Sequence, residues 1–523
     1  MLNNVSMEKK YTRQIIKRIY SNGHFKKLLD EIVPIDFERM YNYEEEDLIK
    51  LEELRRKLES VHDETERRKI KEELRGYMPS DEVKYIILME EMLRVADGLH
   101  WGIGVDEESS FPYFYNGCYW EMISKSIAKE FIAEVAMKSG FNYYDVRISK
   151  VIEALYKQFV LVEPLSMPET KKNVVKINLK NGTFVIKGDS RELVDFDKND
   201  FFKYQLPFDF NPEAQMPLFQ KFLDEVLLEK ESQMVLQEYL GYIFARDLKL
   251  EKCLILIGSG ANGKSVIFDV VTALLGEKNV CSYTLSNLCN DCGYFRAELT
   301  NYLLNYSSEL GGRGCNPDIV KKLISNEPID ARSPYGNPFV LKNYGRFIFN
   351  TNLIPKDIEQ TEAYFRRILP IAFNVTIPEE RRDVNLARKI IDNELSGIFN
   401  WVLEGLDRLL KQKKFTESKA VQETLKMIKK ETNTVVQFLE EVGYVKSDKH
   451  VISTDLYKEY NEFCKKNGHY SVSNTEFLKR LEASGIEVKR KQTNNATWVY
   501  VQVNGQDVID GALKTVAEVL NLK

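Results

Sequence analysis

The sequence predicts an α/β core with a mainly parallel sheet, preceded by a helical and mixed region and followed by a winged-helix domain. Between Leu254 and about Phe373, apolar strand-like runs alternate with helical or loop segments, a pattern typical of parallel α/β sheets. Charged helical spacing dominates residues 1–105. Residues 434–503 show three helical segments and then two β-rich runs, which is the order of a winged helix-turn-helix.

The chain of 523 residues is long enough for about three or four domains. Glu and Lys/Arg recur at i, i+4 within residues 44–75, which is typical of a solvent-exposed helix or helical hairpin. Alternating residues around Asn181-Gly182 predict a β-hairpin. The predicted segments are 1–105, an N-terminal helical domain; 106–211, an accessory domain; 212–395, the α/β domain; 396–433, a helical linker; 434–505, the winged helix; and 506–523, a tail.

The composition is that of an ordinary globular protein, with 43% apolar and 29% charged residues. No apolar run approaches the ~20 residues of a membrane span, and the first residues lack the apolar stretch of a signal peptide. We therefore expect a cytoplasmic protein. The net charge of −5 neither demands nor excludes nucleic acid, because a binding surface can be locally basic on an acidic protein.

The seven cysteines are expected to be reduced thiols, because they form no disulfide framework in a chain of this length. Cys281, Cys289, Cys292 and Cys315 could together form a four-thiolate zinc site. They contain a single Cys-x-x-Cys pair, whereas such sites usually have two, so the sequence favours free thiols and leaves zinc as the alternative.

A glycine-rich octet between a strand-like run and a helical run has the pattern of a phosphate-binding P-loop. Backbone N–H groups of such a loop surround the phosphates of ATP. Lys264 would neutralise the β- and γ-phosphates, and the Ser265 hydroxyl would bind Mg²⁺. The residues predicted to hold the nucleotide are Gly258, Ser259, Gly260, Ala261, Asn262, Gly263, Lys264 and Ser265.

Polar side chains follow the later strand-like runs, where they would meet the nucleotide. Glu309 ends one run and is predicted to bind the metal and activate water; Ser308 stands in place of the usual Asp, so one carboxylate would serve both roles. Asn352 ends another run and would orient a water near the γ-phosphate. Arg366 and Arg367 lie between apolar runs, and one of them, preferably Arg367, would reach a neighbouring subunit's ATP as an arginine finger.

In this order the motifs resemble the superfamily 3 helicases of the AAA+ class, and most closely the phage, plasmid and poxvirus primase-helicase type. The arrangement is also similar to that of replication initiator helicases of staphylococcal genomic, or pathogenicity, islands. The resemblance covers about residues 110–375, so 106–211 resembles the accessory domain of that group. The residues that carry the resemblance are Gly258 to Ser265; Ser307, Ser308 and Glu309; Lys322 and Arg332; Thr351, Asn352 and Pro355; and Arg366, Arg367 and Ile368.

The resemblance implies an AAA+ P-loop ATPase that forms a ring, with a hexamer as the expected assembly, and moves 3′ to 5′ on single-stranded DNA. It also implies that the turn-rich segment 329–342 is a hairpin that lines the ring's pore and contacts DNA through Tyr335, Asn337 and Lys342. Without the resemblance, this segment is simply a surface hairpin.

The predicted winged helix carries basic residues where DNA is commonly contacted. Lys479 and Arg480 lie on the predicted recognition helix, and Lys489, Arg490 and Lys491 lie on the wing. Docking of the helix in the major groove of a double-stranded origin would let helix side chains read bases while the wing contacts phosphates. The alternative is a winged helix that contacts protein.

The sequence therefore predicts an ATP-dependent DNA helicase and replication initiator of a mobile genetic element or phage. Its catalytic residues would be Lys264, Glu309, Asn352, Arg367 and Arg366, with Ser265 and Glu309 at the metal. The alternatives are an ATP-switched DNA-binding initiator or loader, and a monomeric P-loop kinase. Asp195 and Asp197 resemble a polymerase-type metal pair, but no histidine lies between residues 101 and 449, so a separate primase or polymerase is the expected partner.

Overall fold

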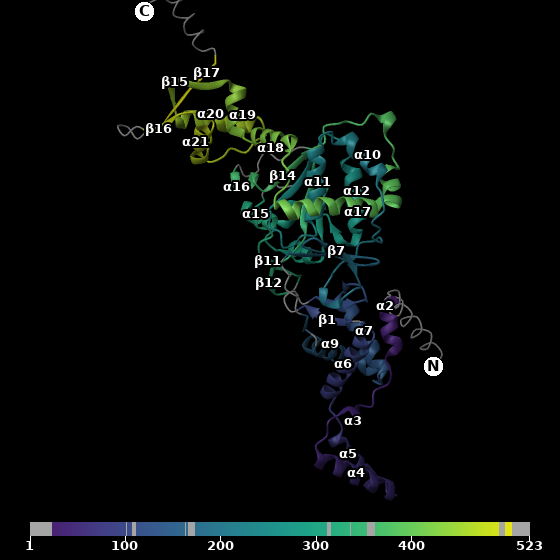
Figure 1. Cartoon of the computed structure of the whole chain (residues 1–523). Helices are drawn as coiled ribbons and strands as arrows, with labels where there is room; N and C mark the ends of the chain where they lie inside the picture. The colour runs from purple at the N-terminus through teal and green to yellow at the C-terminus, as the bar shows by residue number, and fades with distance from the viewer. Residues whose placement is uncertain are drawn as a thin grey trace, which may run out of the picture. The chain divides into compact units, whose positions relative to one another are not determined.

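The chain forms two compact units, Met1–Asp209 and Phe210–Lys523 (Figure 1). No helix among the described residues is long and apolar enough to cross a membrane. The computed structural model describes residues 23–100, 102–106, 111–162, 164–165, 173–310, 315–334, 336–352, 361–490 and 497–504.

Helices of the first unit surround a core rich in aliphatic and phenylalanine side chains. The helices are α2 (Gly23–Glu31), α3 (Phe37–Met40), α4 (Glu45–Ser60), α5 (Glu64–Tyr77), α6 (Asp81–Gly98), α7 (Lys125–Lys138), α8 (Tyr143–Arg147) and α9 (Ser149–Val162). Helices α4 and α5 form the expected hairpin, which closes on its own small apolar cluster that includes Leu51 and Leu74. The predicted boundary at 105/106 is wrong, because Phe25 and Phe159 belong to one core.

Two sheets complete the first unit. A four-stranded sheet has the order β3-β2-β1-β4, and a three-stranded antiparallel sheet has the order β5-β6-β7. The predicted hairpin is β5–β6, where Gly182 has a φ of 141° that favours glycine. The strands are β1 (Gly102–Asp106), β2 (Pro112–Tyr115), β3 (Trp120–Met122), β4 (Pro164–Leu165), β5 (Val174–Leu179), β6 (Gly182–Lys187) and β7 (Ser190–Val194).

The second unit is built on a five-stranded parallel sheet with the order β14-β8-β13-β10-β9. This confirms the parallel sheet predicted from the alternating pattern. Two further strands, β11 (Ile329–Arg332) and β12 (Pro338–Leu341), form a separate antiparallel hairpin. The strands of the parallel sheet are β8 (Cys253–Ile257), β9 (Val280–Cys281), β10 (Leu304–Ser307), β13 (Arg346–Thr351) and β14 (Ile368–Ala372).

Helices from both ends of this segment pack around the sheet. They include α10 (Pro217–Val226), α11 (Lys230–Tyr242), α12 (Lys264–Leu275), α13 (Leu285–Leu288), α14 (Tyr294–Glu298), α15 (Pro317–Ser325), α16 (Glu362–Phe365), α17 (Leu386–Gln412) and α18 (Lys419–Glu431). Residues 396–433 are therefore not a linker. They lie largely in α17 and α18, and α17 packs on α11 so closely that a Cβ on Gly405 would lie 2.6 Å from Gln237 Cγ.

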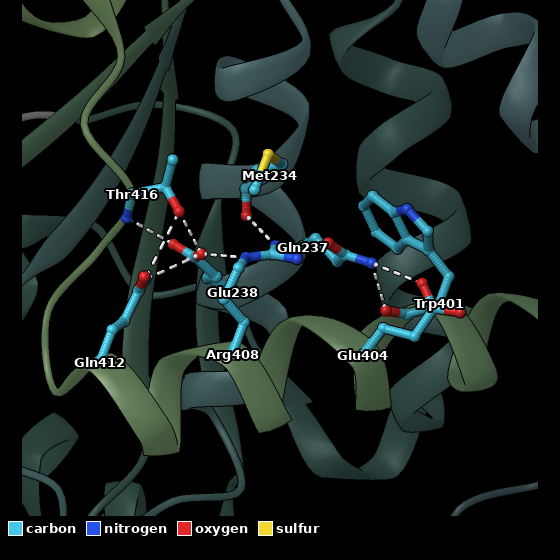
Figure 2. A network of polar contacts seen from close by, with 8 residues as sticks. All are labelled: Met234, Gln237, Glu238, Trp401, Glu404, Arg408, Gln412 and Thr416. Carbon is cyan, nitrogen blue, oxygen red and sulfur yellow. Dashed lines mark hydrogen bonds and ion pairs between the residues drawn. The ribbon is translucent and has the colours of Figure 1, made fainter.

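A buried carboxylate joins α11 to α17. Glu238 is fully buried and accepts hydrogen bonds from Arg408 Nε at 2.5 Å, Gln412 Nε2 at 3.0 Å and the backbone N–H of Thr416 at 2.8 Å. Figure 2 shows these side chains converging from the two helices and from the segment after α17. The network therefore connects α11, which precedes β8, to α17, which follows the last strand of the sheet.

Replacement of Arg408 by alanine is expected to lower the free energy of unfolding by about 3 kcal/mol, because it leaves a buried carboxylate without its cation. Urea unfolding followed by circular dichroism measures the change. Arg388 is a matched control on the same helix: its side chain is 82% exposed and pairs with Asp392 at 3.6 Å, so Arg388→Ala should cost less than ~1 kcal/mol. Equal losses for both variants would contradict this role of the network.

The C-terminal part of the second unit has its own apolar core. Three helices precede the last two strands, as expected, but the strand β15 between the first two helices was not predicted. Ser473 caps α21, since its hydroxyl accepts from Glu476 N at 3.3 Å. The elements are α19 (Thr434–Val442), β15 (Tyr444–Ile452), α20 (Ser453–Lys466), α21 (Asn474–Ala483), β16 (Val488–Arg490) and β17 (Thr497–Val503), with the sheet order β15-β17-β16.

Candidate functional site

The carboxyl ends of three neighbouring strands meet at one edge of the parallel sheet. Strand β13 lies between β8 and β10, and Thr351 pairs with Ile257. The glycine-rich loop starts at Gly258 directly after β8, Asn352 follows β13, and Glu309 lies two residues after β10. Because ligands of open α/β sheets bind outside these ends, the sheet brings three of the predicted site groups to the edge where a ligand is expected.

The loop at residues 258–263 has a tightly folded backbone. Gly260, Ala261 and Gly263 have positive φ values of 110°, 51° and 88°, which cost a residue with a side chain more than they cost glycine. A Cβ on Gly263 would lie 2.8 Å from the ring of Phe222 in α10. The loop therefore passes closely under α10 before α12 begins at Lys264.

Lys264 is buried, and its ammonium group lies inside the loop. Its Nζ donates to the Gly258 carbonyl at 2.6 Å and to Asn262 Oδ1 at 3.0 Å, while Asn262 Nδ2 donates to the Phe373 carbonyl at 3.1 Å. Desolvation lowers the pKa of Lys264 below its usual value. Asn262 thus links the lysine to the end of β14, which is the strand that follows the arginine pair.

Three other predicted groups are exposed at the same edge. Glu309 is exposed, and its backbone is held by Ser307, whose hydroxyl donates to the Glu309 carbonyl at 2.8 Å. Ser265 is exposed in the first turn of α12, and Asn352 is exposed after β13. A hydroxyl, a carboxylate and an amide at one edge are the oxygen-rich groups that suit Mg²⁺ and phosphate chemistry.

The two arginines lie in different environments. Arg367 is 7% exposed; its Nε donates to Ser325 Oγ at 2.8 Å, its Nη1 to the Ala363 carbonyl at 2.7 Å, and its Nη2 lies 3.2 Å from Glu251 Oε2. The Arg366 side chain is 64% exposed and lies 3.6 Å from Glu251. The predicted preference for Arg367 as a group that reaches outward is therefore wrong, because its guanidinium is already bound inside the fold.

The predicted pore residues Asn337 and Lys342 lie at the β11–β12 hairpin, and both are exposed. The third predicted pore residue, Tyr335, lies outside the described residues. Pro355, which follows the predicted Asn352, also lies outside them. Arg332 Nε donates to the Gly336 carbonyl at 2.9 Å and closes the turn.

Basic residues of the C-terminal module differ in how far their side chains are exposed to solvent. Lys479 is exposed, but Arg480 is largely buried, with 13% of its side chain exposed, and pairs with Glu476 at 2.9 Å. Of the two basic residues predicted on the recognition helix, only Lys479 is therefore exposed. The i, i+4 spacing of Glu476 and Arg480 could have indicated this pair. Lys489 and Arg490 are exposed, and Lys491 lies outside the described residues.

The alternative zinc site has no support in the described part of the chain, where no group of three or more His, Cys, Asp or Glu side chains could hold a metal. Cys281 Sγ lies 3.3 Å from Asn305 Oδ1, and burial raises the pKa of Cys281. A hydrogen bond with Cys315 and burial raise the pKa of Cys289.

Asp197, one of the two aspartates that resemble a polymerase-type metal pair, caps a short 3₁₀ turn. Its carboxylate accepts a hydrogen bond from Asn199 N at 2.9 Å.

Three family models match separate parts of the chain. Residues 77–228 match a model described as D5 N terminal like, and residues 430–508 match one described as Poxvirus D5 protein-like. Two parts of the chain are thus D5-like. The matches support a phage or viral primase-helicase family and a replication-related protein. Between them, residues 256–367 match a family of unknown function (DUF5906), and this match includes the strand edge and both arginines.

No curated protein gives a match to the sequence. Among solved structures, "The A form apo structure of NrS-1 C terminal region" is similar over 78% of this chain and 98% of that chain, at 15% identity and a TM-score of 0.43. A second apo structure of the NrS-1 C-terminal region matches over 81% and 100% of the two chains, at 14% identity and a TM-score of 0.44. These low TM-scores do not establish a common fold.

Proposed function

We propose that the protein is an ATP-dependent DNA helicase that initiates replication of a mobile genetic element or phage. The observation that carries the proposal is the shared strand edge, where the loop with Lys264, the exposed Glu309 and the exposed Asn352 follow adjacent parallel strands. A phosphate cradle, a metal-binding carboxylate and a water-orienting amide in this arrangement suit hydrolysis of MgATP.

Each residue has a separate role in this proposal. Lys264 would neutralise the β- and γ-phosphates once it exchanges the Gly258 and Asn262 oxygens for those of ATP. Ser265 and Glu309 would hold Mg²⁺, which supplies charge neutralisation when bound, and Glu309 would also polarise the attacking water. Asn352 would orient that water.

The assembly in this proposal is a hexameric AAA+ ring of the superfamily 3 type. Arg366 is the arginine that we assign to the neighbour's ATP, because its side chain is 64% exposed whereas Arg367 is bound to Glu251, Ser325 and Ala363. The hairpin β11–β12, through Asn337 and Lys342, would contact single-stranded DNA in the pore.

The C-terminal module would direct the ring to a double-stranded origin as a winged helix. Lys479 on α21 is the exposed candidate for contacts in the groove, and Lys489 and Arg490 are candidates for phosphate contacts. The D5-like matches, which lie before and after the sheet in the sequence, support a role in replication. Primers would then come from a separate primase or polymerase.

A strand-displacement assay tests the proposed function. With ATP and Mg²⁺, the wild-type chain should displace a strand from a duplex with a 3′ tail and should leave a duplex with a 5′ tail intact. Glu309→Gln should bind ATP but lose displacement, because the water is no longer activated. Glu277→Gln is a matched control, since Glu277 is exposed in the short turn after α12.

The outcomes separate the competing functions. ATP hydrolysis with DNA binding but without displacement would favour an initiator or loader. A monomeric mass in size-exclusion chromatography with ATP, together with turnover that is independent of DNA, would favour a kinase and contradict the proposal.

A further inference from the structure

The outer face of the C-terminal sheet carries a cluster of rings that the proposed helicase function does not use, next to Lys489, which that proposal assigns to duplex phosphates. On β17, Val499 and Val501 are buried in the module's core at 0% and 1% exposure. Because side chains alternate along a strand, Trp498 and Tyr500 lie on the opposite face. The aromatic rings of the buried core are those of Phe438, Tyr460 and Phe477. Trp498 is only half-buried and lies on the other side of the sheet from them.

An irregularity in β15 places a third ring on this face. Lys446 pairs with Val501 and Val451 pairs with Val499, so residues 447–450 stand opposite the single residue Tyr500. Such bulges redirect side chains. The result is that His450 stacks on Trp498, with ring centroids 3.6 Å apart and planes 6° apart, and lies 5.8 Å from the Tyr500 ring.

The bulge is held in place by specific contacts. Ser447 Oγ donates to Gln502 Oε1 at 2.9 Å, and Lys449 N donates to Ser447 Oγ at 3.1 Å. His450 is exposed even though one face of its ring is covered by Trp498. The stack therefore presents a planar imidazole surface toward solvent.

A lysine side chain lies against the rings. Lys489 Nζ lies 5.3 Å above the Tyr500 ring, and it also pairs with Glu487 at 2.8 Å. Lys489 pairs with Trp498 and therefore lies on the same face of the sheet. Arg490 and Lys446 pair with Thr497 and Val501 and so lie on the other face, whereas Lys449 is an exposed cation in the bulge next to His450.

We propose that this sheet face, defined by His450, Trp498, Tyr500 and Lys489, binds single-stranded nucleic acid by stacking bases on the rings. Binding of single strands without sequence preference combines aromatic platforms with cations along the backbone. Here the exposed rings would supply the platforms, and Lys489, with Lys449 in the bulge, would supply the cations. This site is separate from the α21 helix proposed to contact duplex DNA, and its binding needs neither ATP nor the strand edge.

Photo-crosslinking of the full-length chain tests the location of the site directly. An oligothymidylate of about eight nucleotides, carrying 5-iodouracil, is irradiated with the wild-type chain in the absence of nucleotide, and the crosslinked peptides are sequenced by mass spectrometry. The expected crosslinks lie at His450, Trp498 or Tyr500. Crosslinks confined to other regions, such as the β11–β12 hairpin, would overturn the proposal without affecting the proposed helicase function.

Binding measurements with variants test the stacking. Trp498→Ala should bind the same labelled oligonucleotide about 10- to 100-fold more weakly, a loss typical of one removed stacking platform, while Trp498→Phe should stay near wild type. Tyr470→Ala is the matched control, since Tyr470 is a 63% exposed aromatic residue of the same module outside the sheet. Affinity for a blunt duplex should not change in any of these variants, because paired bases offer no free faces.

A protein-binding surface would behave differently. If Trp498→Ala changes the oligomeric mass of the chain and leaves its affinity for the oligonucleotide unchanged, the face binds protein and the proposal is wrong. Circular dichroism of each variant distinguishes lost stacking from unfolding, and the crosslinking result on the wild-type chain is independent of any variant.

Discussion

Replacing Lys264 with alanine is expected to reduce ATP turnover by about 10³-fold or more, because the charge that develops on the transferred phosphate loses its buried cation. Desolvation lowers the pKa of Lys264, so the ammonium is stabilised when phosphate oxygens replace its present neutral partners. Steady-state ATPase measurements at saturating Mg²⁺ give the result.

Lys278→Ala provides the matched control, because Lys278 is exposed in the short turn directly after α12. It should hydrolyse ATP like the wild type. Binding of Lys264→Ala to duplex DNA through the C-terminal module should survive, which shows that the chain is folded. Wild-type turnover in the Lys264 variant would refute the nucleotide site.

Arg366→Ala is expected to lose ~10³- to 10⁵-fold in turnover, the usual contribution of an arginine finger, while its own loop still binds ATP and its stability is unchanged. Mixing it with Lys264→Ala subunits should restore part of the activity, since some interfaces then combine an intact loop from one variant with an intact finger from the other. The measurement is ATPase activity across mixing ratios, in assemblies whose mixed composition is verified by mass.

Arg367→Ala should behave differently. It removes a buried guanidinium from Ser325, Ala363 and Glu251, so we expect a loss of about 1–3 kcal/mol in unfolding free energy, and no specific rescue in mixtures. If Arg366→Ala turns over ATP like the wild type, or if co-assembled mixtures show no recovery, Arg366 does not act between subunits, and the main argument for a ring is removed.

Local signals in the sequence were sufficient where neighbouring residues determine the structure. The apolar run, the glycines with positive φ and the following helix specify the loop at residues 258–263, because backbone freedom and periodicity act within a few residues. The β5–β6 hairpin was predictable for the same reason. Asn352 and Glu309 could be assigned to one edge because parallel strands expose their carboxyl ends together.

Contacts between segments far apart in the sequence decided which arginine is exposed, where β15 pairs and where α17 packs. Arg366 and Arg367 are adjacent and chemically identical, and the contacts of Ser325 and Ala363 with Arg367 alone leave Arg366 as the exposed group. The charged strand β15 pairs with β17 from the far end of the module, and α17 lies in the core because Glu238 and the close approach at Gly405 hold it there. The sequence by itself determined the local elements and the chemical groups at the strand edge. Tertiary structure decided which of those groups are buried, because burial depends on partners that are far apart along the chain.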